Sequence, residues 1–211
     1  MAASMFPEGP VLMRLMQRWR PYICPFEKLL VHVPVGSSVL DVGCGGGLFL
    51  GLLHQTGRLG RGVGFDASPQ AIQVAQKMAA RVQTNGGGRV LSFQQQDVVD
   101  PWPAGEFDVV SMIDLMHHVA PGAQRRVLVM AAERVGAGGR LLYKDMSTRP
   151  RWRALASRAH DLLISRQWIH YAPVTAVEAW ADECGLKLVH AARINRLWYG
   201  HDLRVFERAL H

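Results

Sequence analysis

A glycine-rich turn that follows a short apolar segment is the feature that most constrains this chain. Residues 39–42 read as a strand that carries one acid, and glycines then occupy the alternate positions Gly43, Gly45 and Gly47. Alternate glycines allow positive φ and leave no Cβ in the way of a ligand. Because an apolar helical segment follows directly, its exposed N–H groups can bind an anion. The sequence therefore predicts a strand, a ligand-binding turn and a helix, in that order.

The spacing of the glycines decides between two kinds of nucleotide-binding turn. The dinucleotide fingerprint Gly-x-Gly-x-x-Gly needs a glycine where this chain has Leu48. The run from Asp41 to Gly47 instead matches Asp-x-Gly-x-Gly-x-Gly, and it resembles motif I of the class I S-adenosylmethionine (SAM) dependent methyltransferases. The resemblance implies that the chain binds SAM and its product S-adenosylhomocysteine, and does not bind NAD.

Two further acids follow apolar segments downstream: Asp66 ends a predicted strand over 61–66, and Asp97 ends one over 90–97. In nucleoside-binding α/β folds an acid at the first of these places accepts hydrogen bonds from the ribose hydroxyls. Taken singly, each acid would fit an ordinary turn at a strand end; the joint spacing favours a cofactor site. The resemblance assigns Asp97 to the adenine amino group, Val98 to the ring and Asp114 to the methionine amino group. The cofactor-binding residues expected from it are Asp41, Gly43, Cys44, Gly45, Asp66, Ala67, Asp97, Val98 and Asp114.

Strand and helix patterns alternate over residues 38–147, which implies parallel βαβ units with right-handed crossovers. Ser68 is expected to cap a helix, with Pro69 at the first helical position and residues 70–81 after it. Further elements are expected as strands over 107–114 and 138–145, a helix over 175–184, and a hairpin of 186–194 and 203–208 with 198–202 as its turn. The resemblance implies an α/β fold in a single domain over 1–211, with lead-in helices over 1–35. The sheet would be Rossmann-like, doubly wound and seven-stranded, mostly parallel with one antiparallel strand.

Residues 149–171 interrupt this pattern after the fifth strand. Apolar side chains from Trp152 to Ile169 fall on one helical face, and most charged side chains fall elsewhere. Ligands bind at the carboxyl ends of strands in open α/β sheets, so we expect this segment to form a helical lid over the acceptor pocket. Its arginines would bind an anionic acceptor, a carrier protein or a membrane; the alternative is an ordinary packed helix with a solvated basic face. These arginines are Arg149, Arg151, Arg153, Arg158 and Arg166.

Composition limits the class of protein. The 211 residues are enough for one full core, and no apolar run approaches the roughly 20 residues that a membrane helix needs. Cys24, Cys44 and Cys184 are too few and too scattered for a disulfide framework or a metal site, so a cytoplasmic location is expected. The net charge of +7 comes from an excess of arginine. It leaves nucleic acid, an anionic membrane, an acidic carrier and an acidic substrate open, and equally a solvated surface.

Two histidines after the fourth strand are the candidate general bases. His117 and His118 stand where acceptor-facing residues project in this fold, and imidazole titrates near neutral pH. His117 is the better candidate of the two to face the pocket; the alternative is that His118 only caps or packs the next helix. Lys144 and Asp145 end the fifth strand, either as an ion pair that holds the loop or as acceptor-binding groups.

The acceptor is narrowed by what the chain lacks. Residues 113–116 are not the Asn/Asp-Pro-Pro-Tyr/Phe motif of enzymes that methylate nucleobase amines or glutamine amide. Nucleic acid is disfavoured because no aromatic-interleaved basic stretch is present, and no metal is expected because Asp145 lacks clustered acidic partners. We expect methyl transfer to oxygen of a small-molecule or carrier-tethered acceptor in secondary or lipid-type metabolism. The alternatives are an RNA or protein methyltransferase that uses its basic surface, and a non-catalytic SAM-binding partner subunit. The sequence does not set the oligomeric state.

Overall fold

A computed structural model describes residues 24–83, 90–147, 170–196 and 199–210 of the chain. Most of the expected lead-in helices and nearly all of the expected lid at 149–171 lie outside the described residues. The chain divides after Pro101 into two compact units, residues 1–101 and 102–211, and each is described by itself. The prediction of a single domain over 1–211 stays a prediction.

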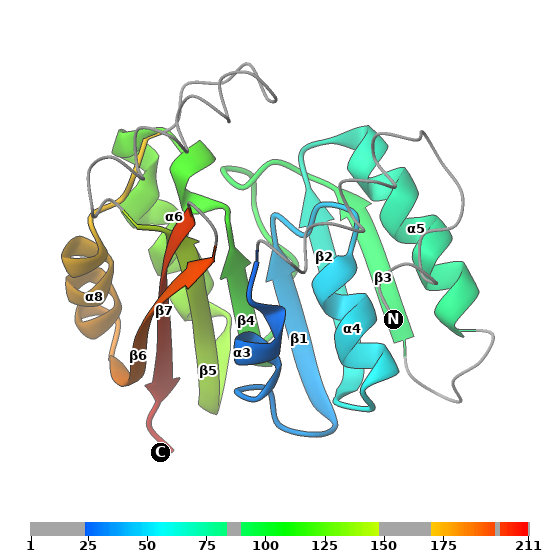
Figure 1. Ribbon diagram of the computed structural model, residues 1–211, viewed down its shortest axis with the longest axis horizontal. Helices are drawn as coiled ribbons and strands as arrows, with labels where there is room; N and C mark the ends of the chain where they lie inside the picture. The colour runs from blue at the N-terminus through cyan, green and yellow to red at the C-terminus, as the bar shows by residue number, and fades with distance from the viewer. Residues whose placement is uncertain (1–23, 84–89, 148–169, 197–198, 211) are drawn as a thin grey trace. The chain divides into compact units, whose positions relative to one another are not determined.

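The first unit is a parallel sheet with the strand order β3-β2-β1. Its elements are α3 (Phe26–Leu30), β1 (Ser37–Val42), α4 (Leu48–Gln55), β2 (Leu59–Asp66), α5 (Pro69–Gln83) and β3 (Val90–Gln95). Helix α4 connects β1 to β2 and α5 connects β2 to β3, and the two helices pack on each other (Figure 1). Right-handed crossovers place both on the same face of the strands.

Burial explains why these segments pair as they do. Strand β1 has almost no exposed surface, because parallel strands are covered on both faces and therefore read as continuous apolar runs. On β2, a Cβ at Gly64 would lie 2.8 Å from Cδ1 of Phe93 on β3. The rings of Phe26 and Phe49, with centroids 6.2 Å apart, join the lead-in helix α3 to α4.

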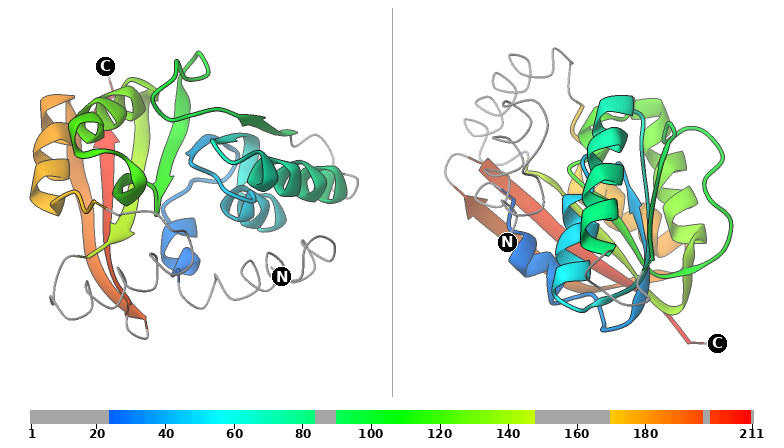
Figure 2. Two further views of the ribbon diagram at one scale, coloured as in Figure 1. Left: turned by 90° about the horizontal axis from the view of Figure 1, so that it is seen from above. Right: turned by 90° about the vertical axis from the view of Figure 1, so that its right-hand side faces the viewer.

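The second unit has the strand order β4-β5-β7-β6, in which β4 and β5 are parallel and β7 runs antiparallel to both of its neighbours. Its elements are β4 (Phe107–Ile113), the 3-10 helix η1 (Met116–His118), α6 (Pro121–Glu133), β5 (Val135–Met146), α8 (Val174–Glu183), β6 (Leu186–Arg196) and β7 (Tyr199–Arg208). Helices α6 and α8 lie side by side along these strands (Figure 2). None of the helices that the structure describes has the length and apolar character that a membrane crossing needs.

The predicted elements that fall within the described residues are present in the predicted order, with corrections at their ends. Ser68 Oγ accepts the N–H of Ala71 at 3.2 Å, which confirms the predicted cap of α5. The predicted hairpin turn over 198–202 is wrong, because strand pairing continues to Arg196 opposite Tyr199 and places Asp202 inside β7. Strand β5 begins at Val135, because pairing with β4 starts there, opposite Phe107.

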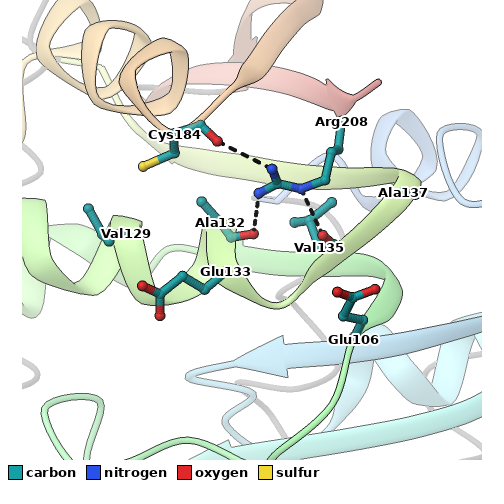
Figure 3. A pocket seen from close by; sticks show the side chains of 8 residues that line it. All are labelled: Glu106, Val129, Ala132, Glu133, Val135, Ala137, Cys184 and Arg208. Carbon is teal, nitrogen blue, oxygen red and sulfur yellow. Dashed lines mark hydrogen bonds between the residues drawn. The ribbon is translucent and has the colours of Figure 1, made fainter. Parts of the chain in front are cut away.

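Arg208, near the end of β7, ties three elements of the second unit together. Its guanidinium donates to the carbonyls of Val135 at 2.9 Å, Ala132 at 2.8 Å and Cys184 at 3.4 Å. It thereby binds carbonyls at the carboxyl ends of two helices, where cations are favoured. A cavity of about 530 Å³ lies beside it, at the end of the sheet where β4 and β5 begin (Figure 3). Burial raises the pKa of the Cys184 thiol in its wall, so this thiol stays protonated.

Arg208→Ala should lower the free energy of unfolding by about 2 kcal/mol, because three carbonyls lose a charged donor. Urea unfolding followed by circular dichroism measures this loss. Arg125→Ala is the matched control, since it breaks the exposed Arg125–Glu183 pair and should leave the free energy of unfolding almost unchanged. Equal losses in the two variants would contradict the role given to Arg208.

Candidate functional site

The glycine turn of the first unit has the geometry that its spacing predicts. Gly43, Gly45 and Gly47 have φ angles of 68°, 54° and 76°, the left-handed region that favours glycine. Gly47 also has no room for a side chain, because a Cβ there would lie 2.8 Å from Cζ of Phe93. Helix α4 begins directly after it, at Leu48. The turn therefore brings backbone N–H groups and a helix N-terminus to the carboxyl end of β1.

Asp66 holds this turn from the end of β2. One carboxylate oxygen, Oδ2, accepts the N–H of Gly45 at 2.9 Å, and Oδ1 accepts the N–H of Ser68 at 2.9 Å. These bonds fix the orientation of a half-buried carboxylate whose remaining lone pairs can accept further donors. A fixed acceptor of this kind suits two neighbouring ribose hydroxyls.

The other expected cofactor residues of this unit lie near the same strand ends. Gln96 donates its N–H to the carbonyl of Asp66 at 3.0 Å, so the exposed Asp97 follows next to the end of β2. Ala67 is exposed and Val98 is half-buried, whereas Asp41 and Cys44 are buried. The glycine turn, the half-buried Asp66 and the exposed Asp97 fit the adenosyl part of SAM. The individual cofactor contacts of all these residues stay predictions.

Asp114 stands at a strained corner of the second unit, directly after β4. Its φ is 54°, an unusual value for a residue with a side chain. Its N–H donates to the carbonyl of Lys144 at 2.8 Å, and its Oδ1 accepts from Lys144 Nζ at 2.5 Å. The Lys144 side chain is completely buried. The corner therefore depends on a largely buried ion pair, which costs desolvation and is weak evidence for a gain in stability.

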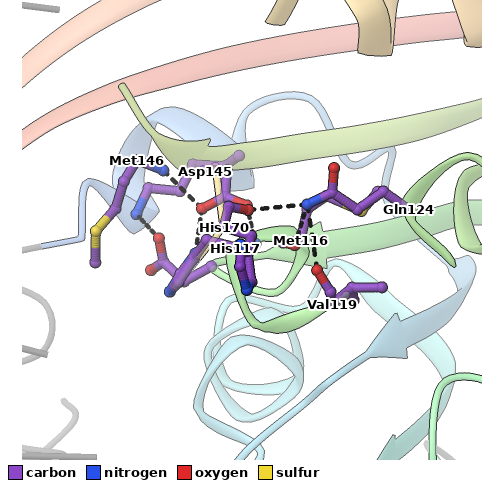
Figure 4. Close-up of polar contacts among 9 residues, drawn as sticks. Met116, His117, Val119, Gln124, Asp145, Met146 and His170 are labelled. Carbon is purple, nitrogen blue, oxygen red and sulfur yellow. Dashed lines mark hydrogen bonds and ion pairs between the residues drawn. The ribbon is translucent and has the colours of Figure 1, made fainter. Parts of the chain in front are cut away.

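His117 pairs with Asp145 at the carboxyl ends of β4 and β5 (Figure 4). The carboxylate accepts from His117 Nδ1 and from the His117 backbone N–H, the latter at 3.0 Å, and it also accepts the N–H of Met146 at 2.7 Å. The histidine and the aspartate are only 2% and 3% exposed. A neutral ring that donates a hydrogen bond from Nδ1–H to Asp145 has its free lone pair on Nε2. A general base needs this arrangement.

Gln124 of α6 fixes the backbone around this pair. Its amide Nε2 donates to the carbonyls of Met116 at 3.2 Å, Val119 at 3.2 Å and His170 at 2.8 Å. The N–H of His170 in turn donates to the carbonyl of His117 at 2.8 Å. Two chain segments that are distant in the sequence are thus joined at the candidate base (Figure 4).

The remaining candidates at this edge lie differently from expectation. His118 is exposed, although its ring centroid is 4.1 Å from that of His117. The prediction that Lys144 and Asp145 pair with each other is wrong, because successive residues of a strand point to opposite faces. Lys144 binds Asp114 instead, and Asp145 binds His117. Within the described ranges no group of three or more His, Cys, Asp or Glu is placed to hold a metal ion. That no metal takes part stays a prediction.

Comparison with known proteins adds the family. A family model described as a methyltransferase domain matches residues 15–191. The ubiquinone biosynthesis O-methyltransferase of Coxiella burnetii (strain Dugway 5J108-111) is 32% identical over 173 residues, which cover 76% of this chain and 68% of that protein. The mitochondrial ubiquinone biosynthesis O-methyltransferase of Schizosaccharomyces pombe is 32% identical over 140 residues, 66% of this chain and 47% of its own.

Solved structures show the same fold. The magnesium protoporphyrin IX methyltransferase of Synechocystis PCC 6803, crystallised with bound S-adenosylhomocysteine, covers 98% of this chain and 92% of its own at a TM-score of 0.72 and 18% identity. This likeness confirms the expected Rossmann-like fold with seven strands, of which one is antiparallel. The family match and the relatives above 30% identity show that the chain belongs to the methyltransferase-domain family and is a class I SAM-dependent methyltransferase.

Proposed function

We propose that this methyltransferase transfers the methyl group of SAM to a hydroxyl oxygen of a small molecule in lipid-type metabolism. The observation that carries the proposal is the buried His117–Asp145 pair at the carboxyl ends of β4 and β5. A hydroxyl must lose its proton as its oxygen is methylated, and a histidine oriented by a carboxylate is suited to take that proton. The names of the relatives, ubiquinone biosynthesis O-methyltransferases, support an oxygen acceptor.

The glycine turn and the strand-end acids would hold the methyl donor. SAM supplies the activated methyl group on its sulfonium sulfur. Asp66, already oriented by the N–H groups of Gly45 and Ser68, would accept hydrogen bonds from the ribose hydroxyls. Asp97 would accept from the adenine amino group, and Asp114 would lie near the methionine amino group. The protein's task is then to align acceptor, methyl and sulfur and to exclude water.

His117 would accept the hydroxyl proton at Nε2 while Asp145 keeps the proton on Nδ1. Because the histidine is 2% exposed, the residues around it have to give way before an acceptor reaches the ring. The same burial keeps bulk water from the base. The buried carboxylate would then stabilise the imidazolium that forms.

The charge of the acceptor, its attachment to a carrier or membrane, and the location of the protein are further parts of the proposal. We expect an anionic or carrier-tethered acceptor, or contact with a membrane surface, from the arginines of segment 149–171. That segment lies almost wholly outside the described residues. A cytoplasmic location is proposed from the scarcity of cysteine.

The proposed function predicts transfer of label from tritium-labelled SAM to small hydroxylated ring compounds. Matched compounds in which an amino group replaces the hydroxyl are the control, and they should accept far less label. The product should be an ether, which resists mild alkali, whereas a methyl ester does not. Label that appears mainly in the amines, in RNA or in protein would overturn the proposal.

Asp66→Ala should weaken SAM binding by about 10²-fold or more, because charge-assisted hydrogen bonds to the ribose are worth about 1.5–3 kcal/mol each. Isothermal titration calorimetry measures the dissociation constant, and NAD should not bind to either protein. Glu106→Gln removes an exposed charge at the start of β4 and should leave SAM affinity unchanged. If the Asp66→Ala variant bound SAM as tightly as the wild type, Asp66 would not belong to the cofactor site.

His117→Gln should lower turnover by about 10²–10⁴-fold, because the hydroxyl proton then has no oriented acceptor. Calorimetry on the same variant should show SAM affinity close to that of the wild type. The exposed neighbour offers the control, since His118→Gln should reduce turnover only a few-fold. Comparable losses in both variants would argue that the histidines act by packing alone.

A further inference from the structure

A row of charged side chains crosses three strands of the second unit and ends at the candidate base. Asp145 of β5 stands directly opposite Asp202 of β7, and Asp202 stands directly opposite Arg193 of β6. Residues opposite each other in an antiparallel pair project from the same face, with Cβ atoms about 5 Å apart. Arg193 Nε binds Asp202 Oδ1 at 3.0 Å, and His117 Nδ1 binds Asp145. The row thus runs His117, Asp145, Asp202, Arg193.

The two carboxylates in the middle of the row repel each other. Asp145 is 3% exposed and Asp202 is 5% exposed, so water screens this repulsion poorly. Like charges directly opposite in a sheet are destabilising unless a cation compensates them. Arg193 supplies one positive charge, and a protonated His117 would supply the second. With neutral His117 the row carries a net charge of −1, and with the imidazolium it is neutral.

The charges of Asp145 and Asp202 both act on the buried side chain of Tyr143. It lies two residues before Asp145 on the same face of β5 and is 2% exposed. Burial raises the pKa of its phenol well above the ordinary value; the charges of Asp145, Asp202 and Asp114 raise this pKa further, and Arg204 lowers it. The field of Asp202 therefore extends beyond its own ion pair with Arg193.

Among the described residues, the other charged groups near His117 are either paired elsewhere or lie on the other face of the sheet. Arg204, opposite Tyr143, binds Glu178 of α8 at 2.5 Å. Lys144 projects from the other face of β5 and binds Asp114. Among the described residues, the titratable groups at this end of the elements around the base are Asp114 before η1, His118 in η1, Tyr143, Lys144 and Asp145 of β5, His170 and Tyr171 before α8, Glu178 of α8, His190 and Arg193 of β6, and His201, Asp202 and Arg204 of β7.

We propose that the Asp202–Arg193 pair sets the proton affinity of His117 through Asp145. Asp202 raises this affinity by adding negative charge beside the His117–Asp145 pair, and Arg193 lowers it by neutralising Asp202. Both are positioning residues, since neither contacts the imidazole. The role in catalysis rests on the proposed function, in which His117 takes the hydroxyl proton. The electrostatic effect itself is a property of the described residues and needs no acceptor.

The two halves of this ion pair should therefore shift the titration of His117 in opposite directions. Asp202→Asn removes a negative charge and should lower the His117 titration midpoint by about half a unit to one unit. Arg193→Gln leaves Asp202 uncompensated and should raise the midpoint by a similar amount. The double variant should return it toward the wild-type value. A pair with only a structural role predicts the same direction of change for both, because either variant breaks the same contact.

Nuclear magnetic resonance of protein labelled at histidine measures this midpoint directly, with His117→Gln used to assign the signal. Glu207→Gln is the matched control: it breaks the Arg140–Glu207 pair, whose residues stand directly opposite each other on β5 and β7, at the far end from Asp145 and Asp202. It should leave the His117 midpoint unchanged. Thermal unfolding of each variant identifies any that fails to fold, and Asp202→Ser then replaces Asp202→Asn.

Shifts in the same direction for Asp202→Asn and Arg193→Gln, or shifts no larger than that of Glu207→Gln, would overturn the proposal. A His117 signal that does not titrate between about pH 5 and 10 in any of these proteins would overturn it as well. Transfer of the tritium label by the wild-type protein tests the proposed function separately. Opposite shifts in a protein without methyl-transfer activity would leave the electrostatic pair in place and remove its catalytic role.

Discussion

The carboxylate of Asp145 is the contact on which the candidate base depends. It closes the turn after β4 by accepting the N–H of His117, it accepts the N–H of Met146, and it orients the imidazole through Nδ1. One side chain therefore sets the position, the tautomer and the local charge of His117. Without it, the backbone N–H groups of His117 and Met146 would lose their acceptor in a region with almost no water, where each unpaired group is costly.

The same arrangement occurs in the first unit. Asp66 stands at the end of β2, just as Asp145 stands near the end of β5. Asp66 accepts hydrogen bonds from the N–H groups of Gly45 and Ser68. In both units an acid near the carboxyl end of a parallel strand holds a neighbouring turn by its backbone. The bonds also orient the carboxylate, so a functional partner meets an acceptor that is already fixed. Ligands bind at this edge of open α/β sheets, and fixed acceptors there reduce the entropy that binding must overcome.

The sequence predicted the first unit better than the second, for a physical reason. The glycine turn depends on local backbone geometry, and Asp66 ends the strand that follows next in the chain and pairs with β1, so their spacing in the sequence is enough to identify them. The partner of Asp145 depends on which strands are neighbours and which way each side chain points. Strand alternation would have separated Lys144 from Asp145, and the parallel pairing of β4 with β5 would have brought Asp145 to His117. Asp202 was missed because the predicted turn placed it outside the strands.

The distribution of buried charge also separates stability from chemistry in the second unit. Where β5 begins, Arg208 binds the backbone carbonyls of Ala132 and Cys184 at helix ends, an arrangement that satisfies both partners. Near the opposite end of the same strand stand a left-handed Asp114, a fully buried Lys144 and two facing carboxylates. Strain of this kind costs about 1–3 kcal/mol, and buried ion pairs often do no better than apolar side chains of the same size. A fold selected for stability alone would have little use for these groups, so their concentration at the carboxyl ends of β4 and β5 supports the proposal that this edge carries the reaction.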